Sequence, residues 1–314
     1  MIYIRDIASY IPNDYIDNYK NSERFSESKD FIDSKIGASK LSRMPEGMNT
    51  SDMAVKAVES LLNKTGLNKQ DIDALVVVTQ NGDFDGLPHT SALVQGKLEL
   101  KEDISCFDIS LGCSGYVYGL SILKAHMIEM GFDNAILVTA DPYSKIIDEN
   151  DRVTSLLFGD AATATLLSTK GELLIERPLL STDGSGELAL VKNDYLYMNG
   201  RQVFNFAATK VPNHVCKYLE KNTLAIDDVD LFLLHQGSAA IIDVIVRKLR
   251  VSKDKVPMDI KDTGNTVSSS IPLLLEKFIN DTTKENIIIS GFGVGLSWAT
   301  NLLRRVKKCL ILML

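Results

Sequence analysis

Two short segments each occur twice along this chain, in the same order, and this repeat restricts the fold more than any other feature. Residues 71–75 (DIDAL) resemble 228–232 (DVDLF), and residues 134–138 (NAILV) resemble 286–290 (NIIIS). Each segment begins an apolar run of the length and composition of a buried strand. A chain that repeats such a unit can bury two sheets against shared central helices. The repeat therefore predicts two similar α/β halves.

Strand-like runs alternate with longer helical patterns throughout the chain. We expect strands at residues 73–80, 104–110, 135–140, 231–234 and 286–290, and helices at 50–64, 115–130, 203–220, 239–250 and 271–280. This alternation is typical of α/β architecture with sheets covered by helices. We expect one half at residues 1–168 and the other at 169–314. No proline- or serine-rich linker separates them, which favours tight packing.

Composition excludes several classes of protein. The 314 residues are 45% apolar, which is enough for a substantial core. A net charge of −7 argues against a general nucleic-acid or anionic-membrane surface. The start lacks the features of a secretory signal, and no run approaches the ~20 apolar residues of a membrane span. We therefore expect a cytoplasmic protein. The four cysteines are not spaced as metal ligands, and we expect reduced thiols at Cys106, Cys113, Cys216 and Cys309.

Cys113 lies in a turn of small residues between an expected strand and an expected helix. Such a turn puts its thiol at a helix N-terminus, where backbone N–H groups and the helix dipole favour thiolate. A nucleophile that forms thioesters needs this environment. A buried structural cysteine is the alternative. Gly112 directly precedes Cys113, and Gly115 follows it with only Ser114 between them. Glycines at these positions indicate that the backbone approaches another group closely, which favours a nucleophilic Cys113 over a structural one.

His235 ends the apolar run 231–234, at the carboxyl edge of the expected sheet, where α/β proteins bind ligands. It could hydrogen-bond a substrate carbonyl or transfer a proton, and a core or capping histidine is the alternative. Asn265 lies in a segment rich in small hydroxyl residues just before a helix. Its amide is either a helix cap or a neutral donor toward a carbonyl oxygen. Residues 290–297 carry alternate glycines, which fit a turn that offers N–H groups to an oxyanion.

Taken in this order, these segments resemble β-ketoacyl-acyl-carrier-protein synthase III of the thiolase superfamily. Further matches lie at residues 50–54, 151–152, 157–162 and 198–204, and the resemblance extends to about residue 304. It implies a thiolase-like fold, in which two α/β halves form five layers, α-β-α-β-α. It also implies a homodimer.

The resemblance implies a Cys-His-Asn triad of Cys113, His235 and Asn265, and a two-step reaction that initiates fatty acid biosynthesis. Cys113 takes an acyl group from an acyl-CoA, and backbone N–H groups of Cys113 and Val294 hold the oxyanion. Malonyl-acyl carrier protein then loses carbon dioxide while His235 and Asn265 stabilise the enolate, which attacks the acyl-cysteine. The substrates are coenzyme A and carrier-protein thioesters, and no metal or other cofactor is required.

The resemblance also implies binding roles for residues outside the triad. Leu87 is expected to reach across the dimer interface and limit the acyl length in the partner's pocket. Arg247 and Lys248 match the face that docks the carrier protein, although Ala240 replaces a characteristic arginine of that face. The substrate-binding residues are expected to be Phe31, where a tryptophan is common, Lys35, Arg152 and Phe204.

Other functions account for parts of the sequence. A specialised synthase of the same superfamily, making a secondary metabolite or surface polymer, differs only in primer and pathway. A hydroxymethylglutaryl-coenzyme A synthase needs a glutamate base that the sequence does not place. A cysteine hydrolase with Cys-His-Asn leaves the internal repeat unexplained, and a degenerate binding subunit conflicts with three filled triad positions. No role is assigned to the tail at residues 305–314.

Overall fold

Two parallel strand pairs with the same register form the framework of the molecule. In the computed structural model, which describes residues 1–306, β4 (Ala74–Val78) lies parallel to β6 (Asn134–Ala140). Likewise β12 (Leu231–Leu234) lies parallel to β13 (Asn286–Gly293). Ala74 faces Ala135 in the first pair and Leu231 faces Ile287 in the second. These are corresponding positions of the repeated segments, so the repeat is confirmed at the level of strand register.

An aspartate fastens each strand pair at its start. Oδ2 of Asp73 accepts hydrogen bonds from the backbone N–H groups of Asn134 and the residue before it, at 3.1 and 2.9 Å. Oδ2 of Asp230 accepts the corresponding bonds from Asn286 and the residue before it, both at 2.8 Å. The carboxylates satisfy N–H groups that have no ladder partner at the strand start. The aspartates of the repeated segments therefore have a structural role.

A mixed ten-stranded sheet connects both pairs in the order β12-β13-β14-β8-β1-β7-β6-β4-β5, and β9 pairs with β14. Its other strands are β1 (Tyr3–Tyr10), β5 (Ser105–Ile109), β7 (Ala162–Ser168), β8 (Leu173–Ile175), β9 (Leu179–Thr182) and β14 (Ser297–Arg305). Two small sheets pair β2 (Tyr15–Asp17) with β3 (Lys40–Ser42) and β10 (Leu190–Lys192) with β11 (Leu196–Met198). The expected boundary at 168–169 falls between β7 and β8 and stays a prediction.

Helices cover both strand groups and also separate them. They are α1 (Asn18–Glu23), α2 (Lys29–Phe31), α3 (Thr50–Thr65), α4 (Thr90–Lys97), α5 (Gly115–Met130), α6 (Arg152–Ser155), α7 (Gly200–Lys221), α8 (Ala239–Leu249) and α9 (Ser270–Glu276). The last is shorter than expected, because the backbone of residues 277 and 278 bonds three residues back and tightens the turn. Within residues 1–306, no helix is both long enough and apolar enough to cross a bilayer.

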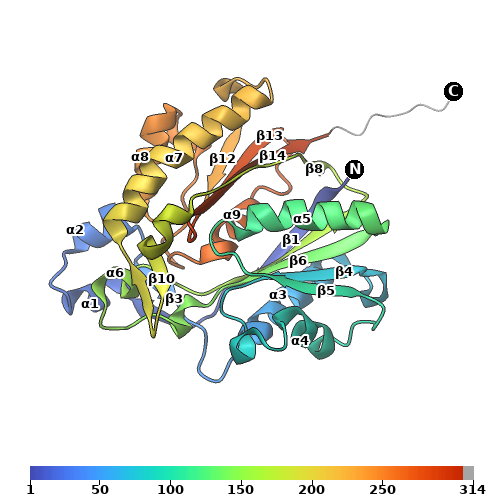
Figure 1. The fold of residues 1–314 in the computed structure, drawn as a ribbon, viewed down its shortest axis with the longest axis horizontal. Coiled ribbons are helices and arrows are strands. Elements are labelled where there is room, and N and C mark those ends of the chain that lie inside the picture. The colour runs from blue at the N-terminus through green and yellow to red at the C-terminus, as the bar shows by residue number, and fades with distance from the viewer. Residues whose placement is uncertain (307–314) are drawn as a thin grey trace.

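Five layers result from the alternation of side chains along each strand. Val76 and Val78 of β4 pack in one core with α5 and α9, which also contains Leu231 and Leu233 of β12. The opposite faces of the strands form two outer cores, one with α3 and α4 and the other with α7 and α8. Figure 1 shows this succession from α7 and α8 at the top to α3 and α4 at the bottom. The turns that precede α5 and α9 consequently meet in the centre of the molecule.

Candidate active site

One pocket brings together the three side chains that the sequence singles out for chemistry. Cys113 precedes α5, His235 follows β12, and Asn265 precedes α9, and all three line a pocket of about 470 Å³. Each is nearly buried, with exposed fractions of 4, 3 and 4%. The strands before Cys113 and His235, β5 and β12, lie at opposite ends of the strand order, so these segments converge because α5 and α9 pack in one core between the two strand groups.

The Cys113 turn fits against β13 only because that strand carries glycines. A Cβ atom at Gly293 would lie 2.8 Å from Cys113 Sγ, and one at Gly291 would lie 2.6 Å from the Cys113 carbonyl oxygen. Both distances are shorter than real Cβ contacts. At Gly112, a Cβ atom would lie 2.7 Å from Gln80 Oε1. The close approach predicted from the glycines around Cys113 is confirmed. The alternate glycines of β13 leave the space that the Cys113 turn occupies.

The electrostatic environment of the thiol differs from the expectation. The pKa of Cys113 is raised to about 12, first because burial disfavours the thiolate and then because the charge of Asp141 repels it. Hydrogen bonds from the backbone N–H groups of Cys113 and Val294 oppose this rise in pKa without overcoming it. The pKa of Cys106 is raised to about 11. The expectation that this turn favours a Cys113 thiolate is therefore wrong, because a helix N-terminus does not offset complete burial.

His235 is held as a neutral ring. Burial lowers its pKa to about 3, and its Nδ1 lies 2.8 Å from the Ser270 hydroxyl. The ring meets Phe292 edge to face, with 5.3 Å between centroids. The Ser270 hydroxyl has two acceptors within reach, since the Val267 carbonyl oxygen lies 3.0 Å away. The contact with Ser270 therefore fixes the orientation of the histidine ring.

The amide of Asn265 is oriented by its own loop. Its Oδ1 accepts a hydrogen bond from the Val267 backbone N–H at 2.9 Å, and its Nδ2 donates to the Gly237 carbonyl at 3.4 Å. Because Oδ1 is occupied, the amide presents its nitrogen rather than its oxygen to the pocket. The second N–H of Nδ2 is thereby available to a carbonyl oxygen bound beside Cys113.

Most of the expected substrate-binding residues lie around the same pocket. Phe31, Lys35, Arg152 and Phe204 all line it. The Arg152 guanidinium lies 5.9 Å from the centre of the Phe31 ring. It also forms an ion pair with Glu27 at 2.5 Å. A planar ligand group entering here would meet an aromatic ring and a cation together.

Leu87, Arg247 and Lys248 lie away from this pocket. Leu87 is 84% exposed and does not line the pocket of its own chain. Arg247 and Lys248 are exposed in the last turn of α8. Nearby Lys253 is paired with Asp243 at 2.8 Å, which leaves less free positive charge at this end of α8 than the sequence indicates. Ala240, at the start of the same helix, lines the pocket.

Residues that sequence reasoning missed form a buried polar group behind Cys113. Asp141 is fully buried and accepts hydrogen bonds from the Gln80 backbone N–H at 2.7 Å and the Ser268 hydroxyl at 2.6 Å. Burial raises its pKa to about 7. Tyr143 donates its hydroxyl hydrogen to Gln80 Oε1 at 2.9 Å. The signal for this group was an aspartate directly after the apolar strand β6, at the edge where α/β proteins bind ligands.

Comparison with known proteins identifies relatives along nearly the whole chain. Residues 107–184 match the family model of 3-oxoacyl-[acyl-carrier-protein (ACP)] synthase III, and residues 219–305 match the model of its C-terminal part. The β-ketoacyl-[acyl-carrier-protein] synthase III of Streptococcus agalactiae serotype III is 33% identical over 316 residues, which are 95% of this chain and 97% of that protein.

Solved structures agree with these sequence matches. The 3-oxoacyl-(acyl carrier protein) synthase III of Pseudomonas aeruginosa superposes with a TM-score of 0.89 at 29% identity and covers 98% of both chains. The priming β-ketosynthase of the R1128 polyketide pathway superposes with a TM-score of 0.87 at 27% identity, covering 97% of this chain and 96% of its own. The thiolase-like fold expected from the sequence is confirmed.

Proposed function

The chain belongs to the β-ketoacyl-[acyl-carrier-protein] synthase III family of condensing acyltransferases, and from this premise we propose that Cys113, His235 and Asn265 carry its reaction. The substrates are an acyl-coenzyme A primer and a malonyl-acyl carrier protein, as in fatty acid biosynthesis. The observation that supports these roles is the meeting of one thiol and two neutral donors in a single pocket. Two half-reactions use different walls of this pocket.

Acyl transfer uses the Cys113 wall. The sulfur adds to the carbonyl carbon of the primer thioester, and the negative oxygen is held by the backbone N–H groups of Cys113 and Val294. Those two groups already donate toward the sulfur. The tetrahedral intermediate then collapses, the coenzyme A thiol leaves with the proton from Cys113, and an acyl-Cys113 thioester remains.

Condensation uses the opposite wall. When the malonyl group loses carbon dioxide, the electron pair of the broken bond moves onto the thioester oxygen as an enolate. Asn265 Nδ2 and His235 Nε2 donate hydrogen bonds to that oxygen. For this role the ring hydrogen has to sit on Nε2, which requires the Ser270 hydroxyl to donate to His235 Nδ1 rather than to the Val267 carbonyl oxygen. The enolate carbon then attacks the acyl carbonyl to give the 3-oxoacyl thioester, and the Cys113 thiolate leaves and takes a proton from solvent.

Intact-protein mass measurement tests the assignment of the nucleophile. Incubation with acetyl-coenzyme A should add one acetyl group per chain, and fragment masses should place it on Cys113. Adding malonyl-acyl carrier protein should remove the group and yield a 3-oxoacyl product. Cys113→Ala should take up no acetyl group, whereas the exposed thiol variant Cys216→Ala should behave as the wild type. An acetyl group on Cys106 or Cys216 would refute the assignment.

A homodimer is the second part of the proposal, and an anchored, exposed loop supports it. Residues 81–89 follow β4, and in this loop the side chains of Phe84 and Leu87 are 71 and 84% exposed. Two large apolar side chains held in water together favour burial against another surface. We assign that surface to a second copy of the chain, whose acyl pocket Leu87 would complete.

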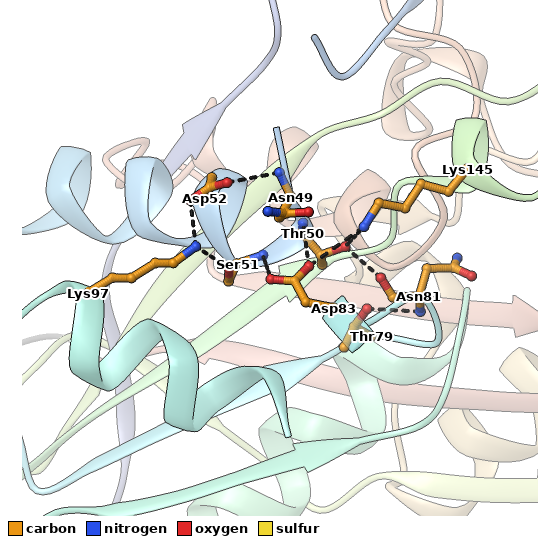
Figure 2. Close-up of polar contacts among 9 residues, drawn as sticks. All are labelled: Asn49, Thr50, Ser51, Asp52, Thr79, Asn81, Asp83, Lys97 and Lys145. Carbon is orange, nitrogen blue, oxygen red and sulfur yellow. Dashed lines mark hydrogen bonds and ion pairs between the residues drawn. The ribbon is translucent and has the colours of Figure 1, made fainter. Parts of the chain in front are cut away.

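Polar contacts hold the base of this loop to α3, as Figure 2 shows. Buried Asp83 accepts hydrogen bonds from the backbone N–H groups of Thr50 and Ser51 at 2.8 and 3.3 Å. Lys145 Nζ lies 3.6 Å from the same carboxylate and donates to the Thr50 hydroxyl at 2.9 Å. The carboxylate thus sits at a helix N-terminus, where the dipole favours it. A loop fastened in this way presents Leu87 in a defined position.

Replacing Leu87 tests both the dimer and its role in the pocket. Leu87→Ala should extend the accepted primers toward longer acyl chains, while Leu188→Ala, which truncates another exposed leucine, should not. Sedimentation of the wild type should give the mass of two chains. A monomer, or an identical primer profile for Leu87→Ala and wild type, would contradict this part of the proposal.

A further inference from the structure

Val267, two residues after Asn265, has a backbone conformation that is unusual for its side chain. Its φ angle is 54°, in the left-handed region, although its side chain branches at Cβ. Steric contacts make this region a rare one for β-branched residues. The other non-glycine residues with positive φ within residues 1–306 are exposed, whereas Val267 is fully buried. Buried strain of this kind persists only where neighbouring contacts hold it, and it concentrates at functional sites.

The backbone of Val267 contacts the side chains that hold both proposed enolate donors. Its N–H donates to Asn265 Oδ1 at 2.9 Å. Its carbonyl oxygen lies 3.0 Å from the Ser270 hydroxyl, which is also 2.8 Å from His235 Nδ1. A return of Val267 to an ordinary conformation would redirect both backbone groups. The Asn265 amide would then lose the bond that fixes its orientation.

Ser268 fastens the chain directly after Val267. Its hydroxyl donates to Asp141 Oδ2 at 2.6 Å, and both side chains are buried. Above its pKa of about 7, Asp141 is a carboxylate, and a hydrogen bond to a carboxylate is stronger than one between neutral groups. Before Val267, the Asn265 backbone N–H donates to the Leu157 carbonyl oxygen at 2.9 Å. The strained residue is thus held between two fixed points.

We propose that Ser268 is a positioning residue for Asn265. Its bond to Asp141 holds Val267 in the left-handed conformation, and the Val267 N–H in turn aims the Asn265 amide. Neither Val267 nor Ser268 lines the pocket, so both act through residues that do. The inference rests on the proposed function, because the aim of the amide matters only if it stabilises the enolate. Without the bond, Val267 relaxes and the amide is displaced, while Cys113 on another segment stays in place.

Ser268→Ala removes the hydroxyl and tests this role. At pH 8, decarboxylation of malonyl-acyl carrier protein should slow by about tenfold, less than after loss of the amide, because a displaced donor still bonds out of line. Acylation of Cys113 by acetyl-coenzyme A should not change, and it also shows that the variant is folded. Ser269→Ala, whose hydroxyl donates to the Ala161 carbonyl oxygen instead, is the matched control. Asp141→Asn is not an equivalent test, because it keeps an oxygen that can accept from Ser268.

Substitutions at Val267 test whether strain is what Ser268 restrains. Glycine adopts the left-handed region without strain, whereas alanine also shortens the side chain but keeps the strain. Decarboxylation in Ser268→Ala/Val267→Gly should therefore recover to the rate of Val267→Gly alone, and in Ser268→Ala/Val267→Ala it should stay low. Val267→Gly should also unfold at a higher temperature than Val267→Ala, the reverse of the usual order for these two residues.

The outcomes separate this proposal from the one on which it rests. A folded Ser268→Ala enzyme with wild-type decarboxylation, or with equal losses in both half-reactions, would overturn the positioning role and leave the proposed function intact. Equal recovery with Val267→Gly and Val267→Ala, or recovery with neither, would overturn it as well. If Ser268→Ala does not fold, Ser268→Ala/Val267→Gly should fold and repeats the measurement, and failure of both to fold counts against the proposal. Wild-type decarboxylation in Asn265→Ala would instead overturn the proposed function.

Discussion

The turn before α5 and the turn before α9 occupy the same place in the two repeat units, yet they provide different chemistry. Each precedes a central helix that leads into a repeated strand, β6 or β13. The first turn carries Cys113 between glycines, and the second carries Asn265 among small hydroxyl residues. One framework has thus placed a thiol and an amide in the lining of one pocket.

The two walls also differ in electrostatics. The Cys113 wall has buried Asp141 behind it, which together with desolvation raises the pKa of the thiol. The opposite wall is neutral, because burial lowers the pKa of His235 and Asn265 has no charge. Under the proposed roles, substitutions on one wall should affect one half-reaction more than the other.

Asn265→Ala should give the largest separation of the two walls. Loss of a donor aimed at a developing enolate costs roughly 10²- to 10³-fold in rate, so malonyl decarboxylation should fall by that factor. Acylation of Cys113 by acetyl-coenzyme A should change little. Rapid-quench measurement of each half-reaction, with the exposed variant Asn150→Ala as control, decides the point. Equal losses in both half-reactions would contradict separate walls.

Ser270→Ala should have a smaller effect confined to the same wall. The ring of His235 loses its Nδ1 partner, and condensation should slow by roughly tenfold, a typical cost of removing a positioning contact. Nitrogen NMR of labelled histidine should show the Nε2–H tautomer in wild type and a mixture of tautomers in the variant. Ser269→Ala, whose hydroxyl bonds to the Ala161 carbonyl instead, is the matched control. Unchanged tautomers in Ser270→Ala would show that this hydroxyl does not orient the ring.

Charge reversal on α8 tests binding outside both walls. Changing Arg247 and Lys248 to Glu should raise KM for malonyl-acyl carrier protein by about fivefold and weaken its salt dependence, because carrier proteins are acidic. Acylation by acetyl-coenzyme A should stay the same. Reversing Lys210 and Lys217, exposed on α7, is the control. If both pairs of reversals give the same KM, carrier docking lies elsewhere.

Asp141→Asn should have the smallest effect and should act on the Cys113 wall. Removing the carboxylate charge lowers the pKa of Cys113, so iodoacetamide should alkylate it about threefold faster at pH 8. The pKa of Asp141 is about 7, so the wild-type carboxyl is mostly protonated at pH 6. The difference in alkylation rate between Asp141→Asn and wild type should therefore be smaller at pH 6. Mass spectrometry of the alkylated peptide measures both rates. A difference that is equal at both pH values would exclude the charge as its cause.

Several features of this molecule were predictable because they depend on local patterns. Strand and helix periodicity placed most elements correctly, and the repeated aspartate segments indicated two similar units before any contact was known. Cys113, His235 and Asn265 each stand next to an expected strand end or helix start, which is where α/β proteins place ligand-binding residues. Their meeting in one pocket depends on how the two halves pack, because β5 and β12 lie at opposite ends of the strand order. Tyr143 and Ser270 were missed because only their neighbours in space distinguish them from ordinary core residues.

The amino-acid sequence by itself determined the repeat, the layered α/β fold and the three residues of the pocket. Only the tertiary structure decided the state of those residues. The pKa of Cys113 depends on burial and on Asp141, and the orientation of His235 depends on Ser270. Periodicity and turn residues act over a few positions, whereas desolvation and hydrogen-bond partners are set by segments that become neighbours only when the chain folds.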